Sequence, residues 1–197
     1  MHKVEISPET PVKGDTVQIL IKADPEEELT VSISFEMVLQ VSKGEYEYEL
    51  SDVEIPSTPN SFTIKAVDVE NLSVSVKMPL NNLGYIWVTK TVDAEDGVAT
   101  VSQGNVPEGT YDVVIFGFAV EGASKVNIEV TASASIMTDE NGLYTYSYNT
   151  SNIPPGEFTI KIGEITKVVT LYKTRPAPST PGAAPPEETL LKRRKRA

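Results

Sequence analysis

Few side chains in this sequence could carry out chemistry, and most of those are carboxylates. The only histidine is His2, close to the N-terminus, and there is no cysteine. No spacing typical of a nucleophile with its base, of a phosphate-binding loop or of a zinc site occurs. The sequence therefore predicts a protein that is not an enzyme, and a site built from carboxylates alone is the one catalytic arrangement left open.

Two acidic segments could supply oxygen ligands to calcium, the only cofactor that the sequence suggests. The first holds Asp93, Glu95 and Asp96, and the second holds Asp139 and Glu140. Neither segment has the spacing of an EF-hand loop. Both are also typical of hairpin turns, which need no metal. No firm metal ligand is predicted.

Two pairs of aromatic residues could form binding surfaces. Phe116 and Phe118 alternate with Val113, Ile115 and Ala119, so both faces of this segment are apolar. A strand of a sandwich needs only one buried face. The second face is therefore either covered by another part of the chain or used as a contact between domains or subunits.

Tyr85 and Trp87 lie two positions apart and share one face of a strand. Exposed aromatics of this kind can stack on sugars. Tryptophan in a β-sandwich commonly fills the core, however, and we expect the core position for both residues.

Two further features concern the surface. Asn71 and Asn149 begin N-glycosylation sequons. The C-terminal basic cluster consists of Lys192, Arg193, Arg194, Lys195 and Arg196. Such a cluster attracts anionic membranes, nucleic acid or acidic partners. It could equally be an appendage with no role in binding.

The charge is distributed unevenly. Residues 1–172 hold ten Lys, no Arg and 26 Asp or Glu, a net charge of −16, whereas residues 173–197 carry a net charge of +5. An acidic body repels phosphate backbones, so nucleic acid binding by residues 1–172 is not expected. Any contact with an anionic surface is therefore expected to involve the basic residues 173–197.

Alternation of apolar and polar residues between Gly, Pro, Asn and Asp predicts strands almost throughout, with no amphipathic helix. The thirteen expected strands are 4–7, 16–23, 29–41, 45–50, 61–67, 72–78, 85–92, 99–102, 110–120, 125–136, 143–148, 157–162 and 167–172.

A pattern near residues 44–65 recurs near residues 142–161. Residues 44–50 resemble 142–148, and residues 62–65 match 158–161 in Phe-Thr-Ile-Lys. This internal similarity indicates one module used twice. We expect an all-β chain of two tandem immunoglobulin-like β-sandwich domains plus a disordered C-terminal tail. The expected divisions are domain 1 at 1–79, a linker at 80–84, domain 2 at 85–173, and a Pro-rich tail with a basic end at 174–197.

Residues 138–146, 153–161 and 168–171 resemble the last strands of Ig-like repeats in archaeal and bacterial cell-surface proteins of the S-layer-related and adhesin-like kind. The resemblance implies an extracellular, non-enzymatic stalk, spacer or adhesive module. Its partners would be proteins or the cell envelope, including copies of itself and glycans. The chain departs from that pattern because it shows neither a signal peptide nor an anchor segment.

Two other functions remain open. One is a carbohydrate- or calcium-binding domain pair. The other is a cytoplasmic adaptor that acts through its basic tail.

Overall fold

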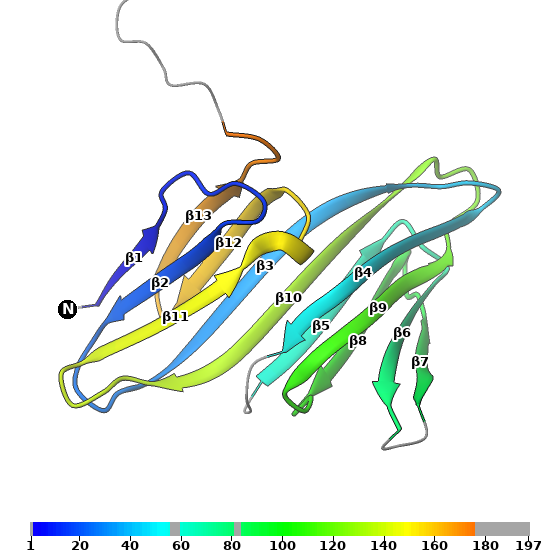
Figure 1. Ribbon diagram of the computed structural model, residues 1–197. Helices are drawn as coiled ribbons and strands as arrows, with labels where there is room; N and C mark the ends of the chain where they lie inside the picture. Colours follow the sequence, from blue (N-terminus) through cyan, green and yellow to red (C-terminus); the bar gives the residue numbers. More distant parts are fainter. Residues whose placement is uncertain (1, 56–59, 81–83, 176–197) are drawn as a thin grey trace, which may run out of the picture.

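A computed structural model describes residues 2–55, 60–80 and 84–175 of this chain. These residues form an all-β fold of three sheets, and the one helical element among them is the 3-10 turn η2, Thr150–Asn152 (Figure 1). No helix in this part of the chain is long and apolar enough to cross a membrane. The basic cluster, most of the predicted tail and residues 81–83 lie outside the described residues.

All thirteen predicted strands are confirmed, with ends that differ by a few residues. They are β1 Lys3–Ser7, β2 Thr16–Lys22, β3 Glu28–Gln40, β4 Glu45–Ile55, β5 Asn60–Val67, β6 Asn71–Pro79, β7 Tyr85–Asp93, β8 Val98–Gly104, β9 Gly109–Phe118, β10 Lys125–Met137, β11 Leu143–Asn149, β12 Gly156–Ile162 and β13 Ile165–Leu171.

The largest sheet has six strands in the order β13-β12-β3-β10-β5-β8, and we call it the base sheet. Its two central strands are thirteen residues long and pair antiparallel along their whole length, from Glu28 opposite Met137 to Gln40 opposite Lys125. Alternation places Leu29, Ile33 and Leu39 on one face of β3, whereas the other face is polar except for the exposed Val38. The base sheet therefore has one apolar face to cover.

Two smaller sheets cover that face side by side. The three-stranded sheet has the order β1-β2-β11, and the four-stranded sheet has the order β4-β9-β6-β7. Under the three-stranded sheet, a core forms around Ile21, Leu29 and Ile162. Under the four-stranded sheet, a larger core forms around Leu72 and Ile115, both fully buried. The molecule thus has two sandwiches that share one base sheet.

Strand pairing interleaves the two halves of the sequence, which differs from the predicted succession of two domains. Strand β2 pairs with β11, β4 pairs with β9, and β3 pairs with both β10 and β12. The predicted linker 80–84 joins β6 to β7, which are antiparallel neighbours with Pro79 opposite Tyr85. The physical reason is the length of β3 and β10, because each of them runs under both smaller sheets.

Gly142 closes the turn between β10 and β11, as the Asn-Gly pair predicts. Its φ is +73°, and a Cβ at this position would overlap the carbonyl oxygen of Ala23. Gly122 has a similar φ of +83° but open space around it. We expect Gly142→Ala to lower the free energy of unfolding by about 1–3 kcal/mol more than Gly122→Ala, because only the first adds a steric overlap to the backbone strain. Urea denaturation of the two variants measures the difference, and equal losses would contradict the geometry.

Candidate functional site

The most prominent feature of the apolar face is a cavity of about 440 Å³ between the two smaller sheets. Strand β11 is the edge of the three-stranded sheet and β4 is the edge of the four-stranded sheet, and both line the cavity. The middle of β3 and β10 lies beneath the space between these edges. Accordingly Ile33 and Ala132, which face each other there, are only partly buried.

Small residues of β10 make room for the cavity. Its run Thr-Ala-Ser-Ala-Ser at 131–135 places Ala132 and Ala134 on the apolar face, where the neighbouring positions on that face are Val130 and Ile136. Two alanines in the middle of a core-facing strand leave volume that larger side chains would fill. The floor of the cavity therefore follows from the local sequence.

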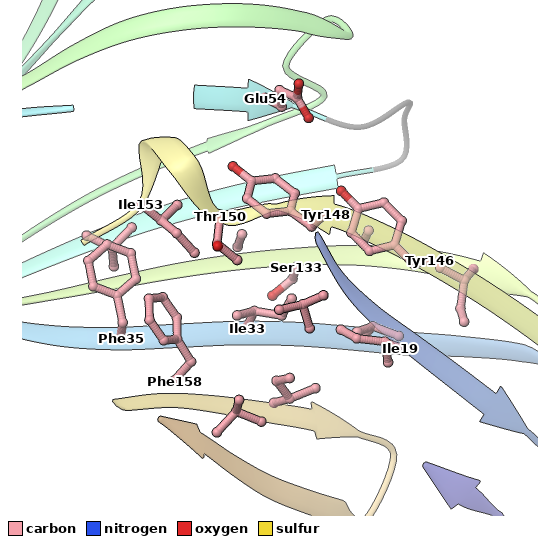
Figure 2. A pocket seen from close by; sticks show the side chains of 18 of the residues that line it. Ile19, Ile33, Phe35, Glu54, Ser133, Tyr146, Tyr148, Thr150, Ile153 and Phe158 are labelled. Carbon is pink, nitrogen blue, oxygen red and sulfur yellow. The ribbon is translucent and has the colours of Figure 1, made fainter. Parts of the chain in front are cut away.

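The walls are aliphatic and aromatic. Tyr144, Tyr146 and Tyr148 alternate along β11 and line the cavity. The rings of Phe35 and Phe158 pack in a tilted arrangement with their centroids 5.2 Å apart (Figure 2). Other apolar lining residues are Val17, Ile19, Ile21, Val31, Leu50, Val53, Phe62, Val130, Ile153, Ile160, Val169 and Leu171. The lining draws on all three sheets.

The turn η2 joins the two smaller sheets at the cavity. The Thr150 hydroxyl donates to the carbonyl of Asp15 at 2.8 Å and accepts from the Gly14 amide at 3.0 Å, so its polar group is satisfied. The Asn152 side chain donates to the carbonyl of Asp52 at 3.3 Å, which links η2 to β4. These bonds hold β11 and β4 in their positions on either side of the cavity.

Besides Thr150, the polar residues that line the cavity are Glu54, Ser133, Ser135 and the three tyrosines. Figure 2 shows the hydroxyls of Tyr146 and Tyr148 on the side of Glu54, away from Phe35 and Phe158. Burial and then nearby charges, including Glu54, raise the pKa of Tyr146 to about 12. Burial and then Glu54 also raise the pKa of Tyr148, whereas a hydrogen bond from the Glu54 backbone lowers it in part. Both phenols are neutral at physiological pH.

Because of these tyrosines, the free energy of unfolding is expected to change with pH in the alkaline range. Because the pKa of Tyr146 is about 12 in the folded protein and about 10 in the unfolded chain, the unfolded state loses its proton first. The stabilising contribution is complete below about pH 10 and disappears as the pH rises toward 12. We expect the urea midpoint to fall between pH 10 and pH 12, with a shallower fall in Tyr146→Phe. A midpoint that changes equally in both proteins would contradict this assignment.

The core position expected for Tyr85 and Trp87 is wrong. The two side chains are 69% and 51% exposed on the outer face of the four-stranded sheet. Lys77 lies 5.1 Å from the centre of the Tyr85 ring and forms an ion pair of 3.0 Å with Asp112. Strand β7 is an edge strand whose Ile86 and Val88 are also exposed, so neither of its faces near Tyr85 is covered.

Phe116 and Phe118 share that outer face with Trp87. Phe118 is 50% exposed, and Phe116 is half-buried beside Trp87 in a shallow depression. On the other face of β9, Ile115 and Ala119 are buried in the core, as the alternation predicts. No described segment covers the two phenylalanines, and their role as a contact between subunits stays a prediction.

None of the calcium candidates belongs to a cluster of three ligand atoms among the described residues, and calcium binding at them stays a prediction. The carboxylate of Asp139 accepts hydrogen bonds from the amides of Asn141 and Leu143 at 2.8 Å each, which hold its pKa below the usual range. Asp93, Glu95 and Asp96 lie at the hairpin between β7 and β8. Glu140 follows Asp139 in the other turn.

Among the described residues, only His2, Asp24 and Glu27 bring three ligand atoms together. The His2 ring already contacts the Glu27 carboxylate at 3.0 Å, and the same carboxylate accepts a hydrogen bond from the Asp24 amide at 3.0 Å. These contacts account for the cluster without a metal.

The two sequon asparagines differ in their surroundings. The side-chain oxygen of Asn71 accepts from the Phe118 amide at 3.1 Å, within the four-stranded sheet. Asn149 is exposed and caps η2 by accepting from the Ser151 amide at 2.9 Å. Only Asn149 lies on an exposed turn, although glycosylation itself stays a prediction for both.

The cavity residues are the part that sequence reasoning missed. Two signals pointed to them, namely the inward row of Tyr144, Tyr146 and Tyr148 and the pair of alanines at 132 and 134. Neither signal shows by itself that the two segments meet, because that depends on the pairing of strands far apart in the chain.

Comparisons with known proteins identify no relative. No protein-family model, curated protein or solved structure matches this chain. The predicted kinship with S-layer-related and adhesin-like repeats, and the cell-surface location that it implies, therefore stay predictions.

Proposed function

We propose that this protein is a non-enzymatic binding module that holds an apolar small molecule in the cavity between its two smaller sheets. The observation that carries this proposal is a cavity of about 440 Å³ whose lining is almost entirely apolar and comes from all three sheets. Small-molecule sites typically have volumes of about 300–1,000 Å³, apolar walls and a few polar groups. This cavity meets each of these criteria.

The lining of the cavity favours a ligand over a simple packing defect. The space is partly open to solvent, so water can enter it, but that water meets mostly apolar walls and few hydrogen-bond partners. An apolar ligand would release this water and bury the walls.

Because of the position of the cavity, a ligand is also expected to stabilise the folded protein. Because β11 and β4 belong to different sheets, a molecule between them contacts both sandwiches at once. Each buried methylene contributes about 0.8 kcal/mol before the losses of association are subtracted. A ligand that binds only the folded protein also stabilises it against unfolding.

We also propose that each half is an immunoglobulin-like sandwich. What supports it is that each half packs two antiparallel sheets around its own core. A long base sheet shared by both halves departs from separate tandem domains.

Titration with N-phenyl-1-naphthylamine, a neutral dye that fluoresces in apolar surroundings, tests the proposed function. We expect one saturable site per chain and a melting temperature that rises with dye concentration. Trp87→Thr serves as the control, because the exposed outer face could also attract the dye, and this variant is expected to bind as the unmodified protein does. Absence of saturable binding, or its loss in Trp87→Thr, would contradict the proposal.

A further inference from the structure

The polar part of the cavity carries negative charge and no compensating cation. Glu54 lines the cavity together with Tyr146 and Tyr148, and because its side chain is exposed, the carboxylate lies at the solvent-facing mouth. None of the described lining residues is Lys, Arg or His. The hydroxyls of the two tyrosines lie on the side of Glu54 (Figure 2). A polar group of a ligand at this position would therefore meet one carboxylate and two neutral phenols.

This arrangement discriminates between head groups by charge. A carboxylate or phosphate would stand beside Glu54 without a cation, and like charges brought together at an interface are unfavourable. The phenols could donate to an anion, but they can also accept from a donor, so they do not offset the repulsion selectively. An ammonium or hydroxyl group could donate to the Glu54 carboxylate, and charge-assisted bonds of this kind are the stronger ones.

The lining extends in two directions over the base sheet. Along β10 it includes every residue from Val130 to Met137 except Thr131, a length of about 23 Å at 3.3 Å per residue, and across the sheet it reaches from Val169 on β13 to Phe62 on β5. Beyond the polar group, a ligand therefore meets aliphatic and aromatic side chains on several strands.

We propose that the ligand is an amphiphile whose polar end donates hydrogen bonds and carries no negative charge, an amine or an alcohol, with that end at Glu54 and Tyr148. This inference rests on the proposed function, because it assigns a ligand class to the same cavity. The carboxylate of Glu54 is the specificity-determining group, and the apolar lining supplies the affinity.

Competition against N-phenyl-1-naphthylamine with three ligands of equal chain length tests the inference. Dodecylamine, 1-dodecanol and dodecanoate are compared at pH 8, where the amine is cationic and the acid is anionic, below the micellar concentrations of these two and below the solubility limit of the alcohol. We expect the amine and the alcohol to displace the dye at concentrations at least about threefold lower than dodecanoate, because the Glu54 carboxylate is exposed. The comparison of amine with alcohol shows whether charge or hydrogen bonding dominates.

A charge reversal provides the matched control. Glu54→Lys is expected to raise the affinity for dodecanoate and lower that for dodecylamine, each at least fivefold. Glu49→Lys makes the same change in net charge on the same strand at an equally exposed position, but Glu49 does not line the cavity, and this variant is expected to leave the order of ligands unchanged.

The outcomes separate this inference from the proposed function. If dodecanoate binds as tightly as the other two ligands, or if neither the amine nor the alcohol displaces the dye, the head-group assignment is overturned while dye binding still supports the cavity. Equal effects of the two lysine variants would also overturn it, because they would indicate a general effect of net charge. Failure of the dye to bind at all removes the proposed function itself.

Discussion

Fragments 1–79 and 85–173, prepared separately, are expected to be unfolded. Each fragment lacks partners that its strands need, because β3 pairs with β10 and β12, and β4 pairs with β9. Both cores are divided as well, since Leu72 and Ile115 of the larger core fall in different fragments. The expected loss is the entire folding free energy, about 5–15 kcal/mol for a typical domain.

Circular dichroism and urea titration of each fragment measure this loss. Neither fragment should show a cooperative transition, whereas an equimolar mixture should regain strand signal if the two halves assemble as in the intact chain. A cooperative transition in either fragment alone would contradict the interleaved pairing, and would support two sequential domains.

Filling the cavity is expected to abolish ligand binding without unfolding the protein. In the double variant Ala132→Leu/Ala134→Leu, two larger side chains would enter the space above the base sheet that these alanines leave open. We expect the affinity for N-phenyl-1-naphthylamine to fall at least tenfold, which corresponds to about 1.4 kcal/mol. The melting temperature should stay the same or rise, because filling a cavity buries apolar surface without overpacking.

Thr131→Leu is the matched control. It adds a leucine next to Ala132 but on the opposite, polar face of the base sheet, because side chains alternate along a strand. We expect this variant to bind the dye as the unmodified protein does. Equal loss in both variants, or unchanged binding in the double variant, would show that the dye occupies another site.

The strands could be predicted from the sequence because each depends on a local pattern. Alternation in residues 44–50 correctly places Tyr46, Tyr48 and Leu50 on the inward face of β4. The Asn-Gly pair at 141–142 likewise predicts the turn that the φ of Gly142 confirms. Such features need only neighbouring residues, and the structure retains them.

Strand order could not be predicted in the same way, because it is set by contacts between distant residues. Strand β3 joins β10, about a hundred positions away, along thirteen residue pairs. The expected length of the segments 29–41 and 125–136 was the only local sign that these strands reach beyond one sandwich. Because consecutive strands tend to be neighbours in a sheet, the sequence instead favours pairing within each half, and hence two separate domains.

The position of Trp87 shows a second limit. Alternation correctly puts Tyr85 and Trp87 on one face of β7, but Ile86 and Val88 on the other face are also apolar. When both faces are apolar, the pattern does not determine which face is buried. The edge position of β7 leaves this end of the strand exposed on both faces.

Methyl-detected NMR during titration with N-phenyl-1-naphthylamine tests the central claim most directly, because it locates the ligand. We expect the methyl signals of Ile33, Val130 and Ala132 at the cavity to shift and saturate together. Those of Val114 on the outer face and of Ile115, fully buried in the larger core, should remain in place. Shifts confined to Val114 and its neighbours, or no shift at saturating dye, would contradict a binding site between the two smaller sheets.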